Sequence, residues 1–132
     1  GPGRAEPLDP TVRSYLLGGD ESALPAIAQL LETIASDCSV RVIIEASHPD
    51  AVIGLPDHSE AAVEWLVALP GAMPGESLAA EVEALGDLPE HVWVAGEAAC
   101  IQRLRTHLFD DRGRSRSTVT ARGYWKQGRA AT

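Results

Sequence analysis

The sequence predicts a three-layer α/β fold, in which a mostly parallel five-stranded sheet of order 3-2-1-4-5 carries helices on both faces. Short apolar runs rich in Val and Ile alternate with amphipathic segments of helical spacing. Parallel neighbours need crossover connections, which are usually helices. Glycines follow two of the expected strands, at Gly18-Gly19 and at Gly96. We expect one domain over residues 14–128, after a tag remnant and flexible lead-in (1–13) and before a tail (129–132).

The first unit is a strand over 15–17, a sharp turn at Gly18-Gly19 and an amphipathic helix. Pro25 has no N–H and fits only the first helical turn, which places the helix start near Ser22, a good N-cap residue. The apolar positions of this helix share one face: Leu24, Ile27, Leu30, Leu31 and Ile34. A strand, a glycine turn and a helix N-terminus form the anion-facing corner of nucleotide-binding folds, although such a corner also occurs without a ligand.

The later elements follow from the same patterns. The second strand covers 40–46, the third 63–69, the fourth 91–95 and the fifth 118–122. Residues 51–62 are expected to form a loop with a short helical turn. One helix begins near Ser77 and ends at Gly86, a suitable C-terminal cap, and another runs from about 97 to 111 with Ile101, Leu104 and Leu108 buried.

Net charge, the length of apolar runs and the spacing of Cys and His residues argue against several functions. The formal net charge of −8 argues against a nucleic-acid binder held by phosphate contacts, although most Lys and Arg residues lie after residue 102. No apolar run approaches the roughly 18 residues of a membrane span. The two cysteines have no metal-type spacing and no secretory signal precedes them, which favours the reducing cytoplasm. His48, Asp50, Asp57 and His58 lie in an irregular loop without ligand spacing, so we expect no metal site.

Four sequence blocks are weak signals one by one but strong in combination. They are residues 16–27 (LLGGDESALPAI), 92–98 (VWVAGEA), 103–108 (RLRTHL) and 123–128 (GYWKQG). In order and spacing they resemble the C-terminal domain of the siderophore-interacting protein family, over about residues 15–128. The members of that family are flavin-dependent ferric-siderophore reductases related to ferredoxin reductases. They pair an N-terminal FAD-binding barrel with a C-terminal NAD(P)H-binding domain, which this chain resembles.

The resemblance implies a set of cofactor-binding residues but no catalytic residue. One wall of the nicotinamide site is then formed by the first corner: Gly19, Asp20, Glu21 and Ser22. The second wall is formed by the other corner: Gly96, Glu97 and Ala98. Tyr124, Trp125 and Lys126 would lie near the flavin and substrate end. Because carboxylates repel a pyrophosphate, we expect the cofactor phosphates nearer Gly96 and the nicotinamide nearer Asp20, unless Asp20 and Glu21 only satisfy the helix start.

The implied cofactors are NADPH or NADH in this domain and FAD on a partner or missing domain, in cis or in trans. A nicotinamide releases two electrons at once and Fe(III) accepts one, so a flavin must stand between them. We expect no turnover by this chain alone, because the FAD-binding barrel is absent from it. Residues 47–50 contain no Lys or Arg to read a 2′-phosphate, which leaves NADPH against NADH open. Lys126 and Arg122 are the candidates for holding an anionic ligand, such as a ferric siderophore.

A second interpretation remains open. The chain is then a non-catalytic interaction module that keeps the fold and binds a protein partner or a siderophore through its exposed carboxyl edge and basic end. A hydrolase is disfavoured, because Gly75-Glu76-Ser77-Leu78-Ala79 is not a nucleophile elbow.

Overall fold

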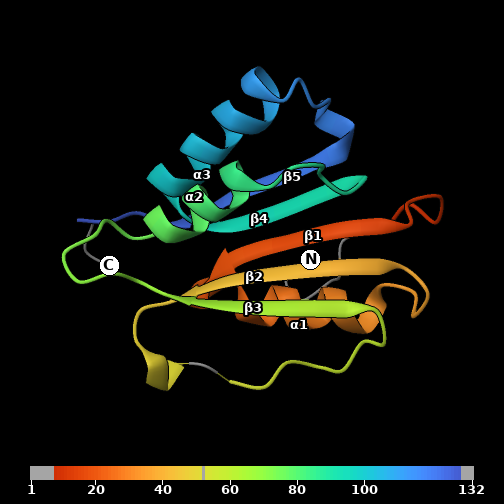
Figure 1. Cartoon of the computed structure of the whole chain (residues 1–132), viewed down its shortest axis with the longest axis horizontal. Coiled ribbons are helices and arrows are strands. Elements are labelled where there is room, and N and C mark those ends of the chain that lie inside the picture. The colour runs from red at the N-terminus through yellow and green to blue at the C-terminus, as the bar shows by residue number, and fades with distance from the viewer. Residues whose placement is uncertain (1–7, 52, 129–132) are drawn as a thin grey trace.

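The computed structural model describes residues 8–51 and 53–128 of the chain. Its sheet contains β1 (Ser14–Asp20), β2 (Ser39–Ala46), β3 (Ala61–Val67), β4 (His91–Glu97) and β5 (Val119–Trp125). The order is β3-β2-β1-β4-β5 and every neighbouring pair is parallel. The predicted strand order is confirmed, and the five strands point their carboxyl ends to the left in Figure 1.

Helices cover the two faces of the sheet unequally. α1 (Leu24–Thr33) packs on one face beneath β1 and β2, and its side chains share a core with Tyr15, Val42 and Trp93. α2 (Glu76–Ala84) and α3 (Ala98–Arg105) pack together on the other face, above β1, β4 and β5 (Figure 1). The last turn after α3, η3 (Thr106–Asp111), is π-helical. The expected stripe of Ile101, Leu104 and Leu108 is fully buried.

The predicted glycine turn after the first strand is wrong. Gly18 and Gly19 continue β1 in regular register with β2 and β4. Gly19 is needed because its neighbours come very close: a Cβ there would lie 2.6 Å from the Cβ of Ala23 and 2.9 Å from the carbonyl oxygen of Ala95. Gly19 therefore permits close packing of the following turn, η1 (Glu21–Ala23), on the strand.

The first helix also begins differently from the prediction. Asp20, not Ser22, is the N-cap of η1, and its carboxylate accepts a hydrogen bond from the Ser22 N–H. Pro25 then lies in the first turn of α1, as its missing N–H requires. The chain thus passes from β1 into the helix without a loop, which holds the Asp20 carboxylate at the edge of the sheet.

Two boundaries beyond the first unit are also corrected. β3 begins and ends two residues earlier than expected, and it is an edge strand with Val63 and Val67 exposed. Gly86 does not cap α2 with a left-handed conformation, since its φ is not positive. The carbonyl groups at the end of α2 instead accept hydrogen bonds from the Arg112 guanidinium, which also binds Gly86 O at 2.6 Å.

β5 continues to Trp125 instead of ending near residue 122, so the GYW segment is strand. A one-residue register shift between Gly96 and Glu97 places Trp125 opposite Glu97. Among the described residues between β2 and β3, the short helix η2 (Pro49–Ala51) is the one regular element, so the connection is a loop with a short helical turn, and this turn lies at the start of the 51–62 range expected for it. Within the described residues, no helix has the length and apolarity needed to cross a membrane.

Candidate functional site

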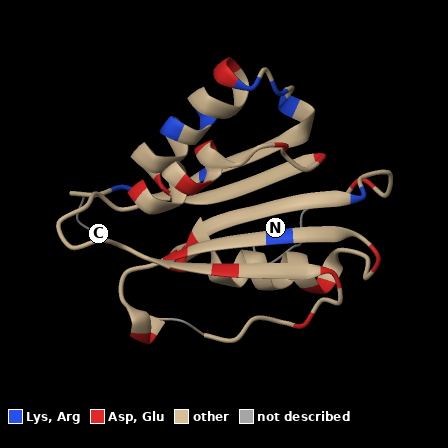
Figure 2. Ribbon diagram, in the orientation of Figure 1, with Lys and Arg blue, Asp and Glu red and all other residues tan. Residues whose placement is uncertain are grey.

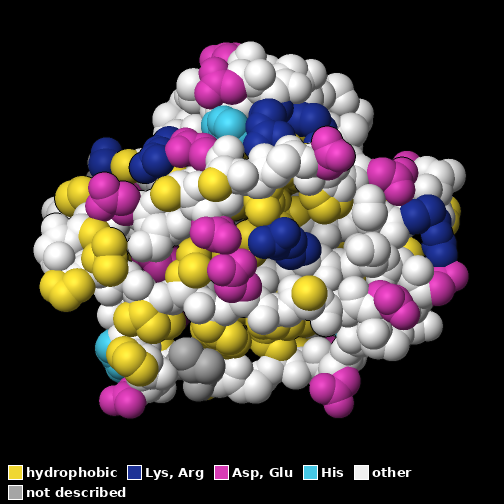
Figure 3. Space-filling view, viewed as in Figure 1, with side chains coloured by type: hydrophobic (Ala, Val, Ile, Leu, Met, Phe, Trp, Pro, Cys, Tyr) yellow, Lys and Arg dark blue, Asp and Glu magenta, His cyan; other side chains and the backbone are white. Residues whose placement is uncertain are grey.

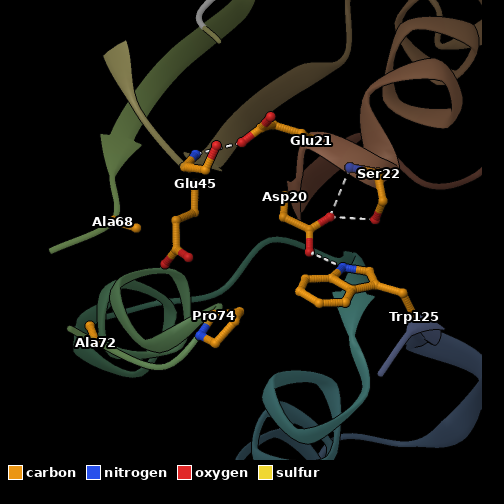
Figure 4. A pocket seen from close by; sticks show the side chains of 9 residues that line it. Asp20, Glu21, Ser22, Glu45, Ala68, Ala72, Pro74 and Trp125 are labelled. Carbon is orange, nitrogen blue, oxygen red and sulfur yellow. Dashed lines mark hydrogen bonds between the residues drawn. The ribbon is translucent and has the colours of Figure 1, made fainter. Parts of the chain in front are cut away.

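A cavity of about 460 Å³ opens at the carboxyl edge of the sheet, where β1 and β2 end beside the loop between β3 and α2 (Figure 4). Carboxyl ends of parallel strands are the usual ligand-binding edge of open α/β folds. Polar side chains from β1 and β2 line one side of the cavity, and Ala68, Ala72 and Pro74 of the loop line the other. Trp125 reaches in from the end of β5.

Asp20 joins the two corners of this edge. Its Oδ1 accepts hydrogen bonds from the Ser22 N–H at 3.0 Å and from the Ser22 hydroxyl. Its Oδ2 accepts the indole Nε1–H of Trp125 at 2.8 Å (Figure 4) and the N–H of Glu97 at 3.1 Å. One carboxylate therefore ties together the ends of β1, β4 and β5.

Gly96 makes this arrangement possible. Its φ of 158° is a conformation that other residues rarely adopt, and a Cβ there would lie 2.7 Å from Asp20 Oδ2. A side chain at position 96 would displace the Asp20 carboxylate from the Glu97 N–H. The two strand–helix corners that the sequence indicates do meet, and they meet through this contact.

Glu45, at the end of β2, is a buried carboxylate that sequence reasoning missed. It is 5% exposed and accepts the N–H groups of Gly75 at 2.7 Å and Leu78 at 3.0 Å, in the first turn of α2. A charge on an apolar strand is expensive to bury unless donors surround it. A lone Glu within the run VRVIIEA was the available signal.

Glu97 plays the same role for α3. It is 2% exposed, it is the N-cap of α3, and both of its carboxylate oxygens accept the Ala99 N–H, at 2.7 and 2.9 Å. Asp20, Glu45 and Glu97 thus occupy the N-terminal N–H groups of η1, α2 and α3 respectively. Each carboxylate satisfies amides that a helix leaves unpaired and is stabilised by them in turn.

The cavity is consequently acidic. Its polar lining includes Asp20, Glu21 and Glu45, and no Lys or Arg is among the described residues that line it. Glu21 accepts a hydrogen bond from the Ser47 N–H, and hydrogen bonding with Ser47 lowers the pKa of Glu21. The cavity therefore favours a neutral or cationic group over an anion.

The predicted site residues fall into three sets. Asp20, Glu21, Ser22 and Trp125 line the cavity. Gly19, Gly96, Glu97 and Ala98 do not line it and belong to the contact between the two corners, with Gly96 and Glu97 against Asp20 and Ala98 against Gly123. Tyr124, Arg122 and Lys126 are exposed and do not line it. Residues near the cavity that sequence reasoning missed are Glu45, Ser47, Ala68, Ala72 and Pro74.

Several of the basic residues near the end of the sequence make structural contacts. Figure 2 shows Lys and Arg gathered on α3 and the segment after it. Arg103 donates to the Glu83 carboxylate at 2.6 and 2.8 Å. Arg105, Arg112 and Arg114 each donate to main-chain carbonyl oxygens. Four of the eight Lys and Arg residues after residue 102 therefore tie α3 and its following loop to the rest of the fold.

Among the described residues, His, Cys, Asp and Glu form no group of three or more that could hold a metal ion. The His58 ring illustrates the reason: its Nε2 hydrogen-bonds the Ala35 carbonyl oxygen, and its Nδ1 accepts the Glu60 N–H.

Comparison with known proteins identifies the family of this chain. Residues 12–128 match the family model described as siderophore-interacting protein, so the chain belongs to the siderophore-interacting protein family. It is 36% identical to an uncharacterized protein of Mycobacterium tuberculosis, over 98% of this chain and 50% of that protein. It is 29% identical to the ferric vibriobactin reductase ViuB of Vibrio cholerae, over 98% of this chain and 49% of that protein.

A third relative is larger. The mycobactin import ATP-binding/permease protein IrtA of Mycolicibacterium smegmatis is 33% identical over 97% of this chain, which covers 14% of that protein. The chain spans about half the length of the first curated relatives that it matches.

Solved structures agree on the fold. A siderophore utilization protein from T. fusca superposes with a TM-score of 0.78 at 30% identity, over 95% of this chain and 49% of that one. The siderophore-interacting protein from Acinetobacter baumannii gives a TM-score of 0.80 at 20% identity, over 92% of this chain and 49% of that one. At that identity the second likeness shows the fold alone.

Proposed function

We propose that this chain is the pyridine-nucleotide-binding half of a ferric-siderophore reductase, which works with a flavin bound by a separate domain in cis or in trans. The observation that carries the proposal is the cavity at the carboxyl edge, which the first strand–helix corner lines and in which Asp20 also binds the N–H of Glu97 at the second corner. Membership of the family and the relative named ferric vibriobactin reductase support the reductase role.

The residues that line the cavity fit the nicotinamide end of NADPH or NADH. The cavity, about 460 Å³ in volume with an apolar loop wall and an indole, suits the neutral nicotinamide ring. Asp20, Ser22 and Trp125 would hold this ring and its amide. When bound, the reduced nicotinamide supplies a hydride, from which the flavin delivers single electrons to Fe(III).

The charged diphosphate fits this cavity less well. The helix N-termini that usually bind phosphate already have carboxylate partners, including the Ala99 N–H beside Gly96. This argues against placing the phosphates at the Gly96 corner. We place them outside the cavity, within reach of the exposed cations Arg122 and Lys126, where the anionic siderophore complex is the alternative occupant.

Binding is tested by titrating NADPH and NADH separately against the ¹⁵N-labelled chain. We expect saturable shifts confined to residues near Asp20, Ser47 and Trp125. Ala72→Trp fills the cavity and abolishes these shifts, whereas Ala80→Trp, on the exposed side of α2, leaves them unchanged. Shifts that persist in Ala72→Trp contradict a cofactor site in this cavity.

The second candidate function is a non-catalytic module that docks a protein. An apolar surface at the carboxyl edge favours it: Leu69 and Met73 of the loop before α2 are 67% and 58% exposed, and Tyr124 and Trp125 are 43% and 40% exposed. Hydrophobic side chains are visible at that end of the molecule in Figure 3. Exposed apolar patches commonly mark interaction sites. If the chain is mixed with a flavin-binding domain and NADPH or NADH still causes no chemical-shift change, this function is favoured.

A cytoplasmic location completes the proposal. Cys38 and Cys100 are both buried and free, which agrees with a reducing compartment.

A further inference from the structure

A second, polar cavity of about 660 Å³ lies beside the end of α3, η3 and the segment that leads into β5. Its lining includes Arg105 of α3, Phe109 and Asp110 of η3, and Arg114 and Arg116 of the segment before β5. It shares no lining residue with the cavity at the carboxyl edge. Lys and Arg gather at this end of the molecule (Figure 2), and we call the site the arginine cavity.

The arginine cavity is positively charged in a chain that is acidic overall. Three guanidinium groups and one carboxylate, that of Asp110, are among its lining groups. Within the described residues, Arg105, Arg114 and Arg116 form no ion pair with Asp or Glu. The sequence contains 19 acidic and 11 basic residues, so these three arginines lack carboxylate partners although carboxylates are numerous. Charges of one sign that line a hollow attract ligands of the opposite sign.

Two of the three guanidinium groups are held in place by main-chain carbonyl groups. Arg105 Nη2 donates a hydrogen bond to the carbonyl oxygen of Ala121 at 2.6 Å. Arg114 Nη2 donates to the carbonyl oxygens of Pro89 and Glu90, at 2.9 and 2.6 Å. Carbonyl oxygens orient a guanidinium group but do not neutralise its charge. The fold therefore keeps two fixed positive charges at the wall of the arginine cavity.

Arg116 is the cation best placed to bind a ligand directly. Its side chain is exposed and makes no hydrogen bond within the part of the chain that the structure describes. Its guanidinium carbon lies 5.6 Å from the centroid of the Phe109 ring, a cation–π contact. This contact orients the guanidinium group without using its N–H donors. Those donors can therefore form two parallel hydrogen bonds to a phosphate or carboxylate group.

We propose that the arginine cavity binds a small polyanion whose charge lies on phosphate or carboxylate oxygens. Three positive charges against one negative charge suit an anion with at least two charges better than a monoanion. The volume lies within the range of small-molecule sites, about 300–1,000 Å³. The site contains neither Arg122 nor Lys126 and is independent of the proposed reductase function.

The experiment titrates pyrophosphate, citrate and acetate separately into the ¹⁵N-labelled chain at neutral pH and low salt. We expect at least one of the two polyanions to cause saturable shifts at the arginine cavity, with a dissociation constant of about 0.1–1 mM. Tighter binding of pyrophosphate assigns a phosphate ligand, and tighter binding of citrate assigns a carboxylate ligand. Acetate, with one charge, should bind at least about tenfold more weakly. Binding should weaken at about 0.15 M salt, because the site is exposed.

Three variants separate a specific site from a general effect of charge. Arg116→Gln should weaken polyanion binding about tenfold, because it removes the direct contact. Arg41→Gln removes the same charge from β2, which β1 and β4 separate from β5, and should leave the affinity unchanged. Asp110→Asn should strengthen binding about threefold, a gain that loss of folding cannot produce. The proposal is overturned if neither polyanion binds saturably, or if Arg116→Gln and Arg41→Gln weaken binding equally.

Discussion

At the scale of single residues, the site depends on carboxylates that bind backbone amides. Asp20 accepts hydrogen bonds from Ser22, Glu97 and Trp125, which come from three separate elements. Hydrogen bonds to a charged group contribute more than neutral ones, and losing the acceptor leaves its donors unpaired. Asp20 is therefore both the centre of the candidate site and a structural link.

Asp20→Ala should destabilise the fold by about 2–3 kcal/mol, because it removes a cap and leaves the Glu97 N–H without its partner. Urea unfolding followed by circular dichroism measures this loss. Trp125→Phe removes only one of the donors to Asp20 and should cost about 1 kcal/mol or less. Equal losses from the two variants would show that Asp20 acts only through Trp125.

Cys100 gives stability a dependence on alkaline pH. Burial, reinforced by the negative charge of Glu45, raises the pKa of the Cys100 thiol to about 12 from an ordinary value of 9.0. The folded state therefore holds the thiol proton more tightly than the unfolded state, and this contribution is complete below pH 9 and declines as pH rises toward 12.

Between pH 8 and pH 10.5, the thiol should cost the folded state about 2 kcal/mol. Urea unfolding at the two pH values measures the loss. Other groups also titrate in this range, so the difference is taken against Cys100→Ala, which lacks the thiol. A Cys100→Ala variant that loses as much stability between the two pH values as the unmodified chain contradicts the assignment.

At the scale of elements, each helix at the carboxyl edge begins on a carboxylate from a strand end. Glu45 belongs to β2 but holds the first turn of α2, which is far from it in sequence. The opposite end of α2 is held by Arg112, from the turn that follows η3. α2 is thus fixed at both ends by side chains of other elements, which compensates for its short apolar stripe.

Glu45→Ala should therefore loosen α2 selectively. The N–H groups of Gly75 and Leu78 lose their acceptor, and we expect a loss of about 2–4 kcal/mol with faster hydrogen exchange at the start of α2. Glu64→Ala is the matched control: Glu64 lies on the neighbouring edge strand, is 41% exposed and pairs with Arg41 at 3.6 Å. A similar loss in both variants would contradict a specific role for Glu45.

At the scale of the whole molecule, we propose that the chain holds one side of a two-part site. The cavity opens at the carboxyl edge beside the exposed apolar side chains Leu69, Met73 and Trp125. Exposed apolar side chains of this kind commonly mark a surface that contacts another domain or protein. The chain spans about half of its first curated relatives, so the proposed activity belongs to the combined protein.

Reduction of a Fe(III) chelate by NADPH or NADH should therefore be absent for the chain alone, with or without added FAD. Addition of a flavin-binding domain from a relative should restore it, because the flavin is then held at the open side of the cavity. Activity of the chain alone would contradict the proposal that a separate domain binds the flavin. The Ala72→Trp variant, which fills the cavity, provides the inactive control for the restored reaction.

The sequence by itself determined the fold class, the strand order and the family. The spacing of apolar residues indicates which face of each helix or strand is buried. The alternation of strands and helices indicates a parallel sheet, because parallel neighbours need crossover connections. Both patterns can be read directly from the linear sequence. The pairing of the two corners at Gly19 and Gly96 was also predictable, because carboxyl ends of parallel strands share an edge.

Only the tertiary structure decided what occupies that edge. The hydrogen bonds from Leu78 to Glu45 and from Glu97 to Asp20 join residues 33 and 77 positions apart, and no local pattern encodes them. The same holds for Arg112, whose charge suggested a binding surface but whose guanidinium binds the end of α2. A charged side chain takes its role from the donors and acceptors that folding brings to it, and those partners are set by the packing of distant elements.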